Sequence, residues 1–106
     1  MNEMEFNNHC DEIMLAIEEA VDSSPEDIDY ETSAGVLTLT IETNGSKVIV
    51  SRQPTQAQIW IAAKSGGYYC NHVSGSWICT TTSETLGLLL HRVCFEQHGG
   101  EIVFDI

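Results

Sequence analysis

Apolar residues recur at every third or fourth position between Glu3 and Val21, and this spacing predicts an amphipathic helix. The stripe contains Phe6, Cys10, Ile13, Ile17, Ala20 and Val21. At about 100° per residue, these side chains project from one side of a helix and form its buried face. Because Pro25 disfavours the helical conformation at Ser24, we expect the helix to end near Asp22 or Ser23.

The middle of the chain has a period of two instead, which is typical of half-buried β-strands. Leu37, Leu39 and Ile41 alternate with polar residues in the segment 36–42. Turn residues such as Asn44-Gly45 and Ser74-Gly75 separate further segments of this kind. Including a short strand near 29–32, the strands are expected at 36–42, 47–53, 56–63, 68–73 and 76–80. We predict about six strands in an antiparallel meander.

A second helix is predicted near the end of the chain. Thr81 and Glu84 have the spacing of a capping box, and Gly99-Gly100 would end the helix. Its inner stripe consists of Leu86, Leu89, Leu90, Val93 and Cys94. The predicted fold class is α+β, a two-layer α/β sandwich in which both helices pack on one face of the sheet. Residues 1–106 would form one domain, and the other face of the sheet would contact water.

Length and composition fit a small globular domain. The chain has 106 residues, of which 42% are hydrophobic, and no apolar run approaches the roughly 20 residues that span a bilayer. The N-terminus lacks the basic and apolar regions of a signal peptide, so we expect a cytoplasmic protein without a membrane partner. Its four cysteines are then expected to be reduced thiols.

The charge is strongly negative and unevenly placed. Sixteen acidic residues outnumber four basic ones, giving a net charge of −12, and eleven of the acids lie before residue 32. No Lys or Arg precedes Lys47. Nucleic-acid binding needs clustered basic residues to neutralise phosphates, so this class is disfavoured. Cations and basic protein surfaces are the favoured partners.

The acidic residues near the N-terminus fall into two neighbouring groups. On the first helix, Asp11, Glu18 and Asp22 lie within ~40° of one another on the wheel, with Glu12 and Glu19 beside them. Beyond the helix come Glu26, Asp27, Asp29 and Glu31, the last three on alternate positions. We predict that the two elements pool these carboxylates into one ridge. An acidic face kept only for solubility is the simpler interpretation. A surface for hard cations such as iron, manganese, calcium or magnesium is the functional one.

Three other residue types add candidate chemistry. Alternation with Ile59 and Ile61 places Trp60 on the open face of the sheet, where exposed Trp residues often anchor interfaces. Cys10 and Cys94 are expected in the core, while Cys70 and Cys79 would face one another across a hairpin. His9 lies beside the acidic helix face and is expected to be a surface side chain. No spacing indicates a zinc site, a catalytic triad or a phosphate loop.

These elements together resemble the frataxin family, in particular its bacterial CyaY branch. The resemblance covers nearly the whole chain, and its most specific blocks are IEEAVD with DIDYE, GVLTLTIETNGSKVIVSRQ, QIWIAAKSGGY, and WIC followed by SETLGLLL. It implies an iron-binding protein of iron–sulfur cluster assembly, acting as an iron-dependent regulator or iron donor. The implied partners are a cysteine desulfurase and a scaffold protein, and the protein would be a monomer that can oligomerise with iron.

The resemblance also implies roles for individual residues. The resemblance assigns iron binding to Glu18, Glu19, Asp22, Asp27, Asp29 and Glu31. Fe²⁺ or Fe³⁺ would bind there weakly, and other hard cations would substitute for it. Asp11, Glu12 and Glu26 match the family's ridge less clearly. The implied partner-binding residues are Trp60, Gln58, Gln53 and Arg52, although Arg52 and Gln53 should point in opposite directions. Trp77 resembles a structural Trp, and Ser51 replaces the Asn that is common in the sheet motif.

Two further classes of function remain open from the sequence. An acidic mimic of nucleic acid would bind a DNA-binding protein without any physiological metal, but it leaves the exposed Trp60 without a role. An enzyme, such as a weak ferroxidase, would need a fixed set of ligands, which the spacing does not show. We therefore expect no catalytic residues.

Overall fold

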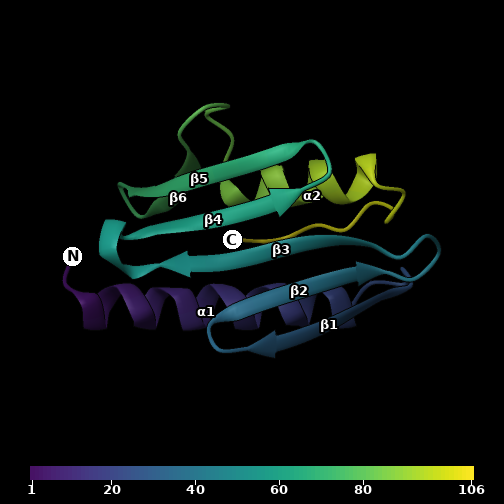
Figure 1. Ribbon diagram of the computed structural model, residues 1–106, viewed down its shortest axis with the longest axis horizontal. Helices are drawn as coiled ribbons and strands as arrows, with labels where there is room; N and C mark the ends of the chain where they lie inside the picture. Colours follow the sequence, from purple (N-terminus) through teal and green to yellow (C-terminus); the bar gives the residue numbers. More distant parts are fainter.

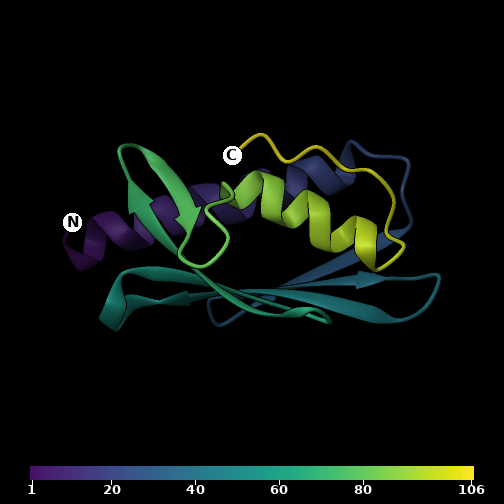
Figure 2. The ribbon, with the colours of Figure 1, turned by 90° about the horizontal axis from the view of Figure 1, so that it is seen from above.

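Both helices lie on the same face of a six-stranded sheet, and the opposite face carries no second layer (Figures 1 and 2). The computed structural model describes residues 1–106. Its elements in order are α1 (Glu3–Asp22), β1 (Ile28–Ser33), β2 (Val36–Ile41), β3 (Ser46–Gln53), the 3₁₀ turn η1 (Pro54–Gln56), β4 (Gln58–Ala63), β5 (Gly66–Val73), β6 (Ser76–Cys79) and α2 (Leu86–Glu96). This confirms the predicted α+β sandwich. Neither helix is both long and apolar enough to cross a membrane.

The sheet is an antiparallel meander in which each strand pairs with its neighbours in the sequence. The strand order is β1-β2-β3-β4-β5-β6, as predicted. One predicted strand is shorter than expected, because Pro54–Gln56 form the turn η1 and Ala57 has a left-handed backbone with φ of 51°. Strand β4 therefore begins at Gln58 rather than at Gln56.

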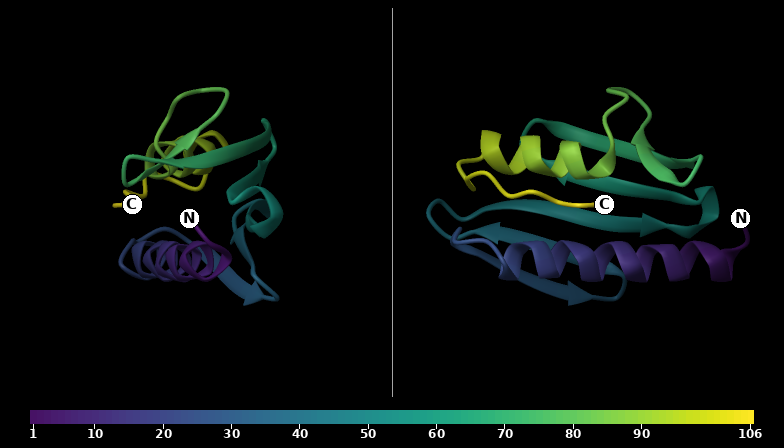
Figure 3. Two further views of the ribbon diagram at one scale, coloured as in Figure 1. Left: turned by 90° about the vertical axis from the view of Figure 1, so that its left-hand side faces the viewer. Right: turned by 180° about the vertical axis from the view of Figure 1, so that it is seen from behind.

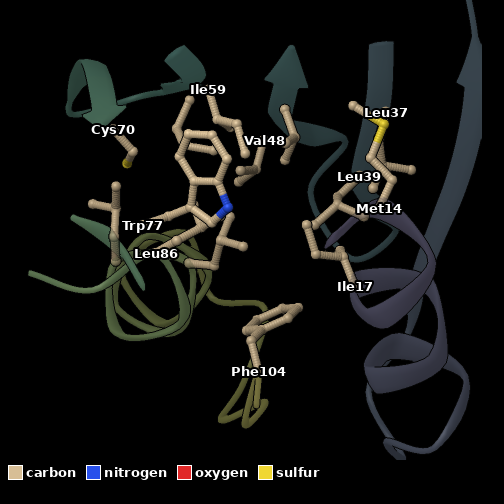
Figure 4. Packing of buried hydrophobic residues seen from close by; sticks show 14 of the residues in the cluster. Met14, Ile17, Leu37, Leu39, Val48, Ile59, Cys70, Trp77, Leu86 and Phe104 are labelled. Atoms are coloured by element: carbon tan, nitrogen blue, oxygen red, sulfur yellow. The ribbon is translucent and has the colours of Figure 1, made fainter. Parts of the chain in front are cut away.

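The core fills the space between the sheet and the two helices. Leu37 and Leu39 of β2, Val48 of β3 and Ile59 of β4 point toward the helices and are almost fully buried, as Figure 4 shows. Helix α1 contributes most of its predicted stripe. Met14 is buried in addition, whereas Ile13 and Ala20 are only partly buried.

The capping box predicted at Thr81 and Glu84 is wrong, since α2 begins at Leu86 with Thr85 as its N-cap. The Thr85 hydroxyl accepts a hydrogen bond from the Leu88 amide at 3.3 Å. The Glu84 carboxylate instead receives two hydrogen bonds from Arg92, each 2.9 Å long. The amide of Cys79 also donates to the Glu84 carbonyl at 2.8 Å, which holds this segment against β6 and prevents an earlier helix start.

The C-terminal tail runs back between the two helices (Figure 3, right). Ile102 and Phe104 join the hydrophobic core, whereas Val103 between them is exposed. The tail packs against α2 at Gly87, where a β-carbon would collide with the Phe104 carbonyl oxygen and lie 3.0 Å from that of Ile106. The short tail thus covers part of the space between the helices, and its close packing on α2 requires a residue without a side chain at position 87.

Replacing this glycine tests how tightly the tail is held. Ala is favoured over Gly within a helix by about 1 kcal/mol, so helix propensity alone predicts that Gly87→Ala stabilises the protein. Because the new methyl group meets backbone atoms, we expect a loss of about 1–3 kcal/mol in the free energy of unfolding instead. Urea denaturation measures the difference, with the exposed neighbour Leu88→Ala as the control. A Gly87→Ala protein more stable than the parent would contradict this packing.

Candidate metal-binding ridge and open sheet face

Two side-chain hydrogen bonds join the acidic end of α1 to the edge strand β1. The Tyr30 hydroxyl donates to Asp22 Oδ2 at 2.8 Å, and the Thr32 hydroxyl donates to Glu18 Oε2 at 2.6 Å. The first of these bonds raises the pKa of Tyr30, because losing the phenolic proton would place a second negative charge beside Asp22. Each carboxylate keeps an oxygen free for solvent or a cation.

The acidic residues of β1 face away from this contact. Tyr30 pairs with buried Leu39 and points toward the helix layer, so by alternation Asp29 and Glu31 point toward the open face. The predicted ridge therefore consists of two carboxylate rows on either side of the sheet edge. We define the acidic edge as both rows together, comprising Glu18, Glu19, Asp22, Asp27, Asp29 and Glu31.

The acidic edge is an open surface and not an enclosed site. Glu19, Asp22, Asp27, Asp29 and Glu31 are exposed, and Glu18 is half-buried. No three acidic, His or Cys side chains anywhere in the chain converge closely enough to surround a metal ion. A cation at this edge would be held by one or two carboxylates, with water completing its coordination sphere.

The less certain ridge residues have different surroundings. Asp11 forms an ion pair with Arg52, whose Nη2 lies 2.7 Å from Asp11 Oδ1, so its charge is largely matched. Glu26 is half-buried, and its carboxyl group lies directly against Gly100 of the C-terminal segment. Glu12 is exposed on α1, about a turn and a half before Glu18. Of these three, only Glu12 is both exposed and without a basic partner.

Arg52 lies on the helix side of the sheet and not on its open face, opposite to Gln53 as expected, and its assignment as a partner-binding residue stays a prediction. It pairs with buried Ile59 and therefore points toward the helices. There its guanidinium also donates to Asn7 Oδ1 at 3.2 Å. Its Nε is buried without a hydrogen-bond partner. The side-chain hydrogen bonds of the guanidinium all go to residues of α1. The Arg52 side chain thereby links β3 to α1.

The open face carries an aromatic pair at its centre. Trp60 is half-buried, and its ring stacks near Tyr69 of β5 with centroids 6.3 Å apart. Gly67 makes room for the indole, since a β-carbon there would lie 3.0 Å from Trp60 Nε1. Ser51 pairs with Trp60 across the β3–β4 ladder. Ile59 and Ile61, on either side of Trp60 in the sequence, are buried against the helices, so the predicted position of Trp60 on the open face is confirmed.

Amide side chains extend the same face beyond the aromatic pair. Gln53 pairs with Gln58, so the two side chains share the face with Trp60. Gln58 Nε2 donates to Asn71 Oδ1 at 2.9 Å. The combination of a flat aromatic centre and amide groups that can both donate and accept hydrogen bonds is typical of a protein-binding surface.

The chain's similarity to proteins of known structure agrees with this geometry. Its sequence matches the frataxin-like domain family over residues 1–100. The chain belongs to the frataxin family. It is 30% identical to the frataxin from Psychromonas ingrahamii, a member of the CyaY protein family, with a TM-score of 0.92 and complete coverage of both chains. This match supports the bacterial CyaY branch.

Yeast frataxins are more distant in structure. A trimeric frataxin from Saccharomyces cerevisiae complexed with ferrous iron is 29% identical, with a TM-score of 0.67 over 87% of this chain and 83% of that one. A second trimeric structure of the yeast protein, with a full-length N-terminus, is 28% identical at the same TM-score, over 90% of this chain and 78% of that one. The frataxin family is linked to iron and to iron–sulfur cluster assembly.

The cysteines of this frataxin-family chain are core residues. All four are buried free thiols, and Cys70 pairs directly with Cys79 across β5 and β6, as predicted. Burial raises the pKa of Cys10 to about 11 and those of Cys70 and Cys94 to about 12. At Cys79 burial acts in the same direction, but hydrogen bonds from Thr82 and Thr81 outweigh it and lower the pKa. Three of the thiols therefore stay protonated at neutral pH and are poor nucleophiles and metal ligands.

Several side-chain contacts of α1 have no signal in the sequence pattern. The pairing of Tyr30 with Asp22 joins residues from two different elements, and Arg52 with Asp11 joins residues 41 positions apart. His9 was expected to be an ordinary surface side chain, yet its ring lies 4.9 Å from that of His72 on β5. Only the three-dimensional arrangement reveals such partners.

Two matched substitutions test whether the charge of α1 is unfavourably placed at its C-terminal end. Glu3 lies in the first turn, where the helix dipole favours an acid, and Glu19 lies in the last turns, where the dipole opposes one and no basic residue is present. Glu3→Gln and Glu19→Gln each remove one negative charge, so the two variants have the same net charge. We expect Glu19→Gln to be the more stable of the two by roughly 0.5–2 kcal/mol at low salt. Equal stability by thermal denaturation would refute the asymmetry.

Proposed function

We propose that this frataxin-family protein is a non-catalytic, iron-binding adaptor of iron–sulfur cluster assembly. Its acidic edge binds Fe²⁺ or Fe³⁺ weakly and docks on a basic patch of a cysteine desulfurase. Its open sheet face around Trp60, Gln58 and Gln53 contacts the scaffold protein. Acting this way, it regulates cluster assembly according to iron supply or donates iron to it.

One observation carries the iron-binding part of the proposal. Of the eleven acidic residues before residue 32, only Asp11 forms an ion pair. Arg92, the other arginine in an ion pair, contacts Glu84 and Glu96 and lies on α2. Such a concentration of exposed, unmatched carboxylates creates a negative potential that attracts multivalent cations.

The ligand chemistry favours hard cations without strong selectivity. Carboxylate oxygens suit iron, manganese, magnesium and calcium, and an open surface imposes no fixed geometry on them. Binding should therefore be weak and spread over overlapping positions. The structure of a yeast frataxin complexed with ferrous iron supports iron as the metal within this family. The trimeric state of the yeast proteins makes iron-dependent oligomerisation part of the same proposal.

Iron and the desulfurase would compete for one surface. A basic patch approaching Glu19, Asp22 and their neighbours gains its affinity and association rate from the same charges that attract iron. Iron loading would thus weaken the contact with the desulfurase, and the amount of bound iron would set the amount of complex. The scaffold would be unaffected by this competition, because Trp60 lies on β4, which β2 and β3 separate from the acidic edge strand β1.

An anaerobic titration of the isotope-labelled protein with Fe²⁺ tests the proposal directly. Paramagnetic broadening should begin at the amides of residues 18–31 and leave the open-face residues around Trp60 unchanged. The triple variant Glu18→Gln, Glu19→Gln, Asp22→Asn keeps acceptors for Thr32 and Tyr30, so its fold should persist while the broadening weakens.

A second arm of this titration adds the desulfurase to the apo and the iron-loaded protein at constant ionic strength. Weaker binding of the loaded form supports competition at the acidic edge, whereas equal binding refutes it. Broadening centred on the cysteines or on scattered histidines would overturn the iron site itself. Desulfurase binding that depends on the acidic edge while iron leaves these resonances untouched would favour the alternative of an acidic interaction module without a metal.

A further inference from the structure

Two histidines meet where the first half of α1 crosses the end of β5. His9 on α1 and His72 on β5 have ring centroids 4.9 Å apart, with an angle of 34° between the ring planes. Both side chains are half-buried. They come from elements 63 positions apart in the sequence, so only the fold brings them together.

The ring of His72 is held in place by the aromatic core beneath it. It lies 5.0 Å from the ring of Trp77, which in turn makes an edge-on contact with Phe6 at 6.0 Å. Trp77 and Phe6 are 5% and 1% exposed, so this support is rigid. One of the two imidazoles is therefore positioned by packing, and the other lies on a regular helix.

Solvent reaches the pair from two sides. His9 and His72 both line an open hollow of ≈ 610 Å³ that also includes Glu5 and Asn71. The same two residues line a second hollow of ≈ 370 Å³ on the side of Glu12 and Trp77. Glu5 and Glu12 flank His9 by about one turn in either direction on the same helix, so both carboxylates add negative charge around the imidazoles.

The separation of the two rings suits chelation of one metal ion. With metal–nitrogen bonds of ~2.0–2.1 Å, each ring centre lies roughly 3 Å from the metal, so two ligands at 90–110° have centres roughly 4.5–5 Å apart. The observed 4.9 Å falls within this range. No carboxylate completes a group of three ligands in this conformation, so water would occupy the remaining positions.

We propose that His9 and His72 form a two-histidine site for a borderline divalent transition metal, with Cu²⁺ bound most tightly and Zn²⁺ and Ni²⁺ more weakly. Imidazole nitrogen prefers these ions, and their order of affinity follows from the general stability series for divalent metals. The site is separate from the acidic edge, since nine or more residues of α1, roughly 13 Å of helix, separate His9 from Glu18. The chain thus presents nitrogen ligands at one end of α1 and oxygen ligands at the other.

Trp77 supplies an internal probe for this site, because bound Cu²⁺ quenches a nearby indole. The chain has two tryptophans, and Trp60→Phe removes the one on the open face of the sheet. In this background, micromolar Cu²⁺ should quench the Trp77 fluorescence, and an excess of Zn²⁺ should restore it, while Mg²⁺ should not. Restoration by Mg²⁺ as effective as by Zn²⁺ would assign the quenching to carboxylates and overturn the proposal.

Substitution of each histidine identifies the ligands. His9→Gln and His72→Gln should each lower the Cu²⁺ affinity about 10-fold or more, since even changes outside the ligand set typically cost that much. His98→Gln is the matched control, because His98 is exposed beyond α2, and it should bind as the parent does. Unchanged affinity in His9→Gln, or an equal loss in His98→Gln, would refute the site.

One variant carries a risk to the fold, because His72 packs on Trp77. If thermal denaturation shows that His72→Gln is unfolded, a Zn²⁺ titration of the parent followed by imidazole ¹⁵N resonances replaces it. Shifts of His9 and His72 together, ahead of His91 and His98, support the site. Shifts led by His91 or His98 refute it.

Discussion

The whole architecture depends on burying only one face of the sheet. Strict alternation in β2, β3 and β4 points the large apolar side chains toward the two helices, and both helices are needed to cover them. The opposite face is then free to display Trp60, and β1 is left as an exposed edge beside α1. The open sheet face and the acidic edge are therefore both consequences of the same one-sided packing. The core determines where the surfaces lie, and the surface side chains determine what they bind.

Charge is the second constraint, and the fold only partly compensates for it. Arg52 matches Asp11 and clamps the middle of α1 to β3, while Tyr30 and Thr32 attach its acidic end to β1 by hydrogen bonds. A hydrogen bond from a neutral hydroxyl orients a carboxylate but leaves its charge in place. The end of α1 thus keeps its repulsion while its geometry is held, an arrangement that favours cations without enclosing them.

The periodic part of this structure could be predicted from the sequence. The α1 stripe and the alternation in β2–β4 depend on local spacing, so both helices, the meander and the outward position of Trp60 were predictable. The role of Glu84 was not predictable, because its carboxylate pairs with Arg92 instead of capping the helix. The side on which Arg52 lies became clear only from the structure, in which Arg52 pairs with buried Ile59. The split of the acidic edge into two rows and the meeting of His9 with His72 depend on how whole elements pack together, which periodicity does not encode.

The central claim is that unmatched charge at the acidic edge costs stability and that bound cations relieve this cost. It is tested most directly by the free energy of unfolding, measured against Mg²⁺ concentration at constant ionic strength. The parent is compared with the Glu18→Gln, Glu19→Gln, Asp22→Asn variant. A cation that binds only the folded state stabilises it by RT ln(1 + c/Kd), where c is the free cation concentration, so the parent should gain stability with added Mg²⁺. The variant should start higher and gain much less. Parallel gains in both proteins would contradict the claim.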